Sequence, residues 1–168
     1  MQTKYPIKRF ADSIENVSDI PSKIPGIIIK TIEDFISRFG SLEEASVSKK
    51  PQPDKWSKKE ILGHLIDSAS NNHQRFVRVQ HLKSLNIPGY EQQEWVKIQQ
   101  YNSREWKELL SFWRLYNLHL AHIIGNMDEA SLQDSITIGA NEPTTIGHIA
   151  LDYVGHIQHH LLQIEQMD

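Results

Sequence analysis

Histidine is the side chain in this sequence best suited to chemistry, because nine histidines are present and cysteine is absent. A neutral imidazole is the commonest metal ligand in proteins. His156 and His160 are four residues apart, and in a helix this spacing sets two side chains one above the other on the same face. Such a pair could share one metal ion, but a tetrahedral zinc site needs at least a third protein ligand.

The last predicted helix has an apolar face, and only two of its histidines lie beside that face. Successive residues advance by about 100° around a helix axis, which puts His156 and His160 at the edge of the apolar stripe. His148 and His159 fall on the opposite side, so we predict that they are solvated and bind no metal. The stripe itself consists of Ile146, Ala150, Tyr153, Ile157, Leu161 and Ile164.

A third ligand must come from another helix, and His64 is the candidate. It lies on the shoulder of an apolar stripe, whereas His73 faces the outer side of the same helix. A lone histidine in such a position is also typical of a structural hydrogen bond, so both interpretations stay open at this point. The stripe consists of Ile61, Leu65, Ala69, Phe76 and Val79.

The other histidines predict no metal site. His119 and His122 lie away from the apolar stripe of their helix, so we expect them at the surface. His81 is near the predicted C-terminus of a helix, where a positive imidazole interacts favourably with the helix dipole.

Four long segments have the apolar spacing of three and four residues that is typical of amphipathic helices. We predict long helices over residues 24–39, 57–82, 103–125 and 144–167, and a short helix within 91–101. Residues 41–55 and 131–143 are polar connections, in which 135–138 is only weakly strand-like. The predicted fold class is therefore all-α, a four-helix bundle.

Residues 56–61 contain a well-formed helix start. Ser57 can accept a hydrogen bond from the backbone N–H of Glu60, and the Glu60 carboxylate can reach back to the N–H of Ser57. Trp56 and Ile61 occupy the two positions whose apolar side chains pack across such a cap. This start puts His64 between one and two turns into its helix.

The composition excludes several classes of protein. The chain has 168 residues and a net charge of -3, which fits one folded domain over 1–168 with a poorly patterned leader over 1–20. The charge does not supply the basic surface that nucleic acids require, and no apolar run approaches the roughly 20 residues that span a bilayer. Without cysteine there is no disulfide, no Cys-ligated zinc and no cysteine nucleophile. With no signal peptide visible, we expect a cytoplasmic protein without nucleic-acid or membrane partners; a homodimer is compatible with the pattern.

Two segments resemble the DinB/YfiT-like superfamily of metalloenzymes. In the first, Trp56–Asp67, a tryptophan and a capping residue open the helix that carries His64. In the second, Asp152–Ile164, His156 lies four residues before a His-Leu-x-Gln-Ile ending. Either motif alone is moderately specific, and the two together, with their similar separation, are strongly indicative.

The resemblance implies a four-helix bundle that binds a divalent metal ion, zinc or nickel. His64, His156 and His160 match the three metal ligands of the family in order. Members of the family include DNA-damage-inducible proteins, a proposed metal-dependent hydrolase, and transferases that use low-molecular-weight thiols such as bacillithiol or mycothiol. They do not share one substrate, so the resemblance implies a metal site and leaves the small-molecule substrate open.

Four polar residues close to the predicted ligands could position them or the substrate. Glu60, Asp67 and Asp152 each lie about one turn from a predicted ligand and could orient an imidazole through its second nitrogen. Gln163 follows the last predicted ligand by three residues and could line the pocket. A capping role for Glu60 and surface roles for the other three stay open.

We predict a metal-dependent enzyme that acts on a small molecule. Transfer of a low-molecular-weight thiol to an electrophile is placed ahead of hydrolysis, because a metal ion can itself deprotonate a thiol. The thiol would have to be a co-substrate, since the chain has no cysteine. The alternatives are a metal-dependent hydrolase and a non-catalytic, metal-binding helical stress protein.

Overall fold

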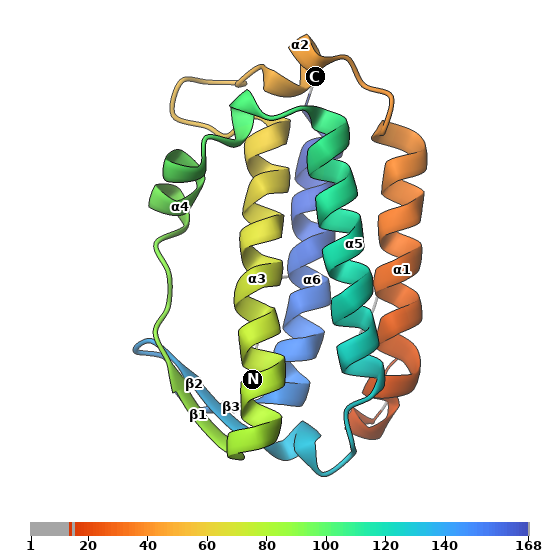
Figure 1. Ribbon diagram of the computed structural model, residues 1–168, viewed down its shortest axis with the longest axis vertical. Helices are drawn as coiled ribbons and strands as arrows, with labels where there is room; N and C mark the ends of the chain where they lie inside the picture. Colours follow the sequence, from red (N-terminus) through yellow and green to blue (C-terminus); the bar gives the residue numbers. More distant parts are fainter. Residues whose placement is uncertain (1–13, 15, 168) are drawn as a thin grey trace.

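Four long helices form the body of the molecule (Figure 1). The computed structural model describes residue 14 and residues 16–167. The long helices are α1 (Ile20–Phe39), α3 (Lys58–Leu82), α5 (Trp106–Gly125) and α6 (Ile146–Glu165). The shorter helices are α2 (Glu44–Ser48) and α4 (Gln92–Gln99), with 3-10 turns η2 (Val17–Asp19), η3 (Tyr101–Ser103) and η4 (Ser131–Gln133). The predicted all-α four-helix bundle is confirmed.

Each long helix has two long neighbours. α3 packs against α5 and α6, and α1 packs against the same two helices. In Figure 1, α3 and α5 run in one direction, while α1 and α6 run in the opposite direction. α3 and α6 are therefore antiparallel neighbours, so the start of α3 lies beside the end of α6.

The apolar spacing explains why these segments are helices and which faces they bury. α1 buries Ile20, Ile24, Ile28, Ile32 and Phe35, which recur every three or four residues along one side. Burying each such side chain contributes roughly 1.5–3 kcal/mol relative to leaving it exposed. Within the part of the chain that the structure describes, no helix has both the length and the apolar character needed to cross a bilayer.

The helices that carry the predicted ligands begin at their predicted caps. Ser57 Oγ accepts a hydrogen bond from the Glu60 N–H at 3.2 Å, and Glu60 Oε2 accepts one from the Ser57 N–H at 2.8 Å. At the start of α6, Thr145 Oγ1 accepts from the backbone N–H of His148 at 3.3 Å. These bonds satisfy N–H groups that have no partner inside the helix.

Some boundaries differ from the prediction. α1 begins at Ile20 rather than at residue 24, because Pro21 is tolerated in a first turn, where its missing N–H has no partner to lose. The connection over 41–55 contains α2, and the short helix within 91–101 is α4 followed by η3. Most of the predicted leader, residues 1–13 and 15, lies outside the described residues.

A small sheet is present that the sequence analysis did not predict. β1 (Ser84–Ile87) pairs in parallel with β2 (Ser135–Ile138), and β2 pairs in antiparallel with β3 (Thr144–Thr145). β2 is the weakly strand-like segment. β1 depends on hydrogen bonds to residues far along the chain, so local spacing does not reveal it.

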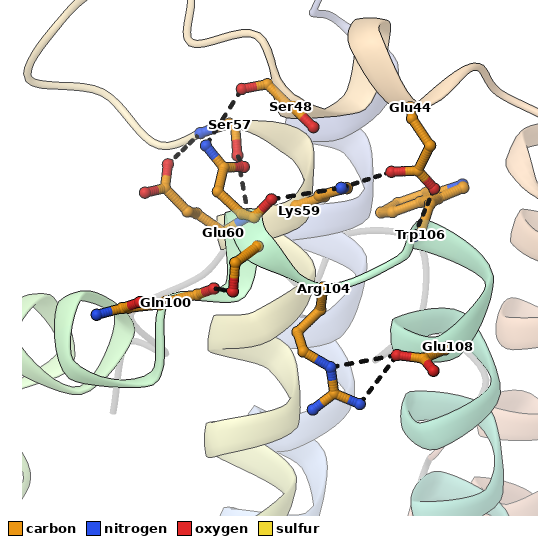
Figure 2. A network of polar contacts seen from close by, with 11 residues as sticks. Glu44, Ser48, Ser57, Lys59, Glu60, Gln100, Arg104, Trp106 and Glu108 are labelled. Carbon is orange, nitrogen blue, oxygen red and sulfur yellow. Dashed lines mark hydrogen bonds and ion pairs between the residues drawn. The ribbon is translucent and has the colours of Figure 1, made fainter.

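A polar network ties several segments together at the end of the bundle where α3 begins (Figure 2). The Glu44 carboxylate accepts a hydrogen bond from the backbone N–H of Trp106 at 2.8 Å and pairs with the buried ammonium of Lys59. Asn102 Oδ1 accepts from Ser57 Oγ at 2.6 Å, and Asn102 Nδ2 donates to a carbonyl of α2 at 3.2 Å. The network attaches α2, η3 and the start of α5 to the start of α3.

Tyr101 packs its ring directly on the backbone of α3. A Cβ atom at Gly63 would lie 2.1 Å from Cδ2 of Tyr101, so only glycine allows this approach. The Tyr101 hydroxyl donates to Asp67 Oδ1 at 2.6 Å, one turn further along α3. The ring therefore holds η3 against the turn of α3 that precedes and includes His64.

Replacing Gly63 by alanine should destabilise the protein, because the new methyl group would overlap the Tyr101 ring. We expect the free energy of unfolding to fall by about 1–3 kcal/mol, the usual cost of overpacking. Chemical denaturation measures the change. Gly26→Ala in α1 is the matched control, since no heavy atom lies within 4 Å of a Cβ there, and alanine should stabilise this helix by up to about 1 kcal/mol. A Gly63→Ala variant as stable as the parent would contradict the close packing.

Candidate metal centre

Three histidines from two helices meet at the end of the bundle where α3 begins. His64 on α3 is fully buried, His156 on α6 is 7 % exposed, and His160 on α6 is half-buried. The ring centroids are 5.0 Å apart for His64 and His156, 4.8 Å for His64 and His160, and 4.6 Å for His156 and His160. The antiparallel packing of α3 and α6 thus brings together the three residues that the sequence analysis selected.

The nitrogen atoms of the cluster are spaced for one metal ion. Nε2 of His64 and Nε2 of His156 are 3.0 Å apart, and one nitrogen from each of the three rings lies within 4.8 Å of the others. Two imidazole nitrogens bound to one tetrahedral zinc ion at 2.0–2.1 Å are about 3.3 Å apart. An all-imidazole donor set also suits zinc and nickel. The residues present therefore fit a divalent ion.

The protein surroundings favour the neutral, ligand-competent form of the imidazoles. Burial lowers the pKa of His64 to about 3, and the nearby His160 lowers it further. Burial also lowers the pKa of His160 to about 4, although its hydrogen bond to Gln163 acts in the opposite direction. At neutral pH both rings are uncharged, and each keeps a nitrogen lone pair.

Two polar side chains contact the ring nitrogens that face away from the cluster centre. Ser68 Oγ is 3.3 Å from Nδ1 of His156, and Gln163 Oε1 is 3.0 Å from Nδ1 of His160. Gln163 Oε1 can only accept, so its contact favours the His160 tautomer with a proton on Nδ1 and leaves Nε2 with its lone pair. Ser68 Oγ can accept from Nδ1 of His156 in the same way, which would leave Nε2 of that ring as the donor to a metal. Gln163, which the sequence analysis placed near the pocket, therefore contacts the predicted ligand His160. Ser68 was not selected from the sequence, although its position four residues after His64 is a signal that could have found it.

Besides the contact of its Nε2 with His156, the His64 ring is oriented by packing against aromatic side chains. The Trp56 ring lies 5.1 Å from it at an angle of 32°, and the Tyr90 ring lies 6.5 Å away. His64 Nδ1 is buried without a hydrogen-bond partner. Trp56, which the sequence analysis assigned to the helix start, thus also forms part of the wall of the metal centre.

Two of the carboxylates that could have oriented an imidazole make other contacts. Glu60 closes the cap of α3 and pairs with Lys50 at 2.9 Å. Asp67 Oδ1 accepts from Tyr101 at 2.6 Å and from Gln99 at 2.6 Å, and burial raises the pKa of Asp67 against the effect of these two bonds. Both residues therefore stabilise the structure around α3 and have no hydrogen bond to the cluster.

Asp152 has a different position from the other two carboxylates. It lines a cavity of about 240 Å³ whose wall includes His156, one turn further along α6. Of the three clustered histidines His156 lines this cavity, so a small molecule in it would lie close to both the Asp152 carboxylate and the His156 ring. This geometry makes Asp152 the carboxylate best placed to exchange a proton with a substrate.

The remaining histidines lie outside the cluster. His159 is exposed, and its ring contacts the His160 ring at 5.0 Å. His73 Nδ1 lies 3.2 Å from the Tyr116 hydroxyl, and the His73 and His119 rings are 5.1 Å apart on the α3–α5 side. Within the described residues, the only group of three or more such ligands that could hold a metal is that of His64, His156 and His160.

The fold and the cluster together define a class: helical-bundle proteins with a three-histidine cluster that could hold a metal ion. The DinB superfamily profile matches residues 28–164, and the chain belongs to this superfamily. The resemblance stated from the two sequence motifs is thereby confirmed.

The chain is also similar in sequence or in fold to individual proteins. The chain is 26 % identical over 172 residues to a proposed metal-dependent hydrolase of Halalkalibacterium halodurans, which covers 99 % of this chain and 96 % of that protein. It is 23 % identical over 141 residues to another proposed metal-dependent hydrolase, from Oceanobacillus iheyensis, covering 82 % of this chain and 81 % of that protein. The fold is similar to that of YfiT from Bacillus subtilis, with a TM-score of 0.75, 14 % identity, and coverage of 88 % and 85 % of the two chains. That structure is described as a four-helix bundle of unusual topology.

Replacement of His64, His156 or His160 by alanine should abolish metal binding, because each removes one of the three donors that converge among the described residues. We expect bound metal to fall from about one ion per chain to near zero. Elemental analysis of protein purified without an affinity tag measures this content. His148→Ala and His159→Ala are the controls and should leave the metal content unchanged; a large loss in either would show that the ligand set is wrong.

Proposed function

We propose that this protein is a metal-dependent enzyme in which His64, His156 and His160 hold a divalent ion next to a small-molecule cavity. The observation that carries the proposal is the 3.0 Å separation of the His64 and His156 Nε2 atoms, with the His160 ring beside both. Two buried imidazole nitrogens are not expected at this distance unless a proton or a metal ion lies between them. The names of the two related proteins add independent support for metal dependence.

The residues around the cluster have separable tasks. Ser68 and Gln163 hold the His156 and His160 rings in the required tautomer and orientation. Trp56 packs against His64 and keeps water away from one side of the centre. When bound, a divalent ion supplies a Lewis acid that polarises substrate oxygen and makes a water or thiol proton easier to remove.

Hydrolysis is the reaction that these surroundings support best. Hydrolysis needs a group that accepts a proton from the attacking water, and the Asp152 carboxylate lines the same cavity as His156. The sequence analysis placed thiol transfer first because a metal ion can itself deprotonate a thiol, so that this reaction needs no protein base. The position of Asp152 in the cavity wall supports hydrolysis instead, and the hydrolase names of the relatives point the same way.

Thiol transfer stays a prediction. It needs no protein carboxylate, since coordination alone can deprotonate a thiol, and it requires an external thiol because the chain has no cysteine. A purely structural metal is the remaining alternative. In such a structural site a fourth protein ligand would close the coordination shell, whereas a catalytic site keeps a position for water or substrate.

The test compares two sets of substrates on zinc- and nickel-loaded protein. One set contains ester, amide and phosphate compounds, and the other contains a bacillithiol- or mycothiol-type thiol with a chlorinated or epoxide electrophile. We expect metal-dependent turnover of the hydrolytic set. Turnover of the thiol set alone would overturn hydrolysis and retain the enzyme, whereas no turnover of either set would favour the structural alternative.

Asp152→Asn should lower hydrolytic turnover by about 100-fold or more, because an amide does not accept the proton that a carboxylate accepts. Its metal content should be unchanged, since Asp152 is not a ligand. The control is Asp34→Asn, an exposed carboxylate on α1 whose ion pair with Lys30 is at the surface. If Asp152→Asn turns over substrate at the parental rate, Asp152 has no part in proton transfer.

A further inference from the structure

The cavity beside the metal centre has a second polar end that the proposed reaction does not use. Its wall includes His156 and Asp152 from α6, and Ser68, Asn72 and Arg75 from α3, with Tyr90 from the connection after β1. Its volume of about 240 Å³ is below the range of 300–1,000 Å³ that is usual for drug-sized ligands. The cavity therefore suits a metabolite-sized molecule that reaches from the metal centre to Arg75.

Arg75 has an unused hydrogen-bond donor in this wall. Its Nη1 donates to Asn72 Oδ1 at 3.2 Å, but its Nε is buried and has no acceptor in the protein. A buried N–H of a charged group without an acceptor is unfavourable, and native proteins rarely keep one without a functional reason. A guanidinium presents its N–H groups in a planar fork that matches the two oxygens of a carboxylate.

A continuous chain of polar contacts joins Arg75 to the metal centre. Asn72, which accepts from Arg75, donates through Nδ2 to Ser68 Oγ at 3.3 Å. Ser68 Oγ in turn lies 3.3 Å from Nδ1 of His156. Asn72 and Ser68 are both buried. The chain runs along one face of α3, because its members are separated by three and four residues.

The charges in the cavity select among anions. Burial lowers the pKa of Arg75, while Tyr90 and Asp152 raise it, so the guanidinium keeps its charge. Asp152 in the same wall offsets the charge of Arg75, and its repulsion of a phosphate dianion is greater than its repulsion of a singly charged anion. A singly charged carboxylate, which pairs with one planar guanidinium, fits these residues better. Asn72 is not a further donor to it, because its Nδ2 already donates to the backbone carbonyl and the hydroxyl of Ser68.

We propose that Arg75, held in place by Asn72, binds the carboxylate of a small substrate whose reacting group lies at the three-histidine centre. This inference rests on the proposed function and adds the substrate class to it. Arg75 is then the residue that determines specificity, and it lies eleven residues beyond His64 on α3.

The test measures binding of simple probes to zinc-loaded protein by calorimetry. Succinate offers one carboxylate to Arg75 and one to the metal centre, and succinamide is its uncharged counterpart. We expect succinate to bind and succinamide to bind at least about tenfold more weakly, since a charge-assisted hydrogen bond is lost. Inorganic phosphate should bind more weakly than succinate.

Arg75→Gln should weaken succinate binding by about tenfold or more and leave the zinc content unchanged. Arg78→Gln is the matched control, because Arg78 is exposed and lies three residues further along α3. This variant should bind succinate as tightly as the parent protein does. Arg75→Lys keeps the charge without the planar fork, so it should give an intermediate loss. Thermal unfolding checks that each variant is folded.

The outcomes separate this inference from the proposed function. Equal binding of succinate and succinamide by the parent, or equal succinate binding by the parent and Arg75→Gln, overturns the carboxylate site and leaves the metal-dependent enzyme in place. Tighter binding of phosphate than of succinate also overturns it. Absence of zinc binding by the parent protein would instead overturn the proposed function. If Arg75→Gln does not fold, the carboxylate site is tested by two other results. These are the difference between succinate and succinamide binding by the parent protein and the succinate binding of Arg75→Lys.

Discussion

The antiparallel packing of α3 against α6 is the constraint on which the functional centre depends. His64 lies near the start of α3, and His156 and His160 lie toward the end of α6, so only antiparallel neighbours bring them to one level. A small rotation of either helix would move an imidazole into the apolar core or into solvent. The buried apolar stripes that set the rotation of the two helices therefore also set the metal geometry.

Burial has two linked effects on this centre. It removes water from the His64 ring and so lowers the pKa of the imidazole, which keeps the ring neutral and its lone pair available. It also makes the converging nitrogens unfavourable unless a shared proton or a metal ion lies between them. The same apolar packing that stabilises the bundle thus creates a site whose polar atoms a cation could satisfy.

The segments outside the four long helices close the site and keep it in place. Tyr101 packs on Gly63 and bonds to Asp67, while Glu44 and Lys59 join α2 to α3 at the same end of the bundle. On the other side, the contacts from Ser68 through Asn72 to Arg75 extend the polar face of α3 along the cavity. Because α3 carries both His64 and Arg75, the position of the three-histidine cluster and the position of the cavity wall at Arg75 are linked through this helix.

The sequence by itself determined the helices, their caps and the shared face of His156 and His160, because these follow from contacts between residues three or four apart. The two motifs also identified His64, through a family resemblance rather than through its helical position alone. Only the tertiary structure decided which polar residues serve the site. In the structure Glu60 pairs with Lys50 and Asp67 accepts a hydrogen bond from Tyr101. Ser68 contacts His156, and β1 pairs with β2. Those partners are far apart in the chain, so their contacts depend on how whole elements pack and cannot be derived from local spacing.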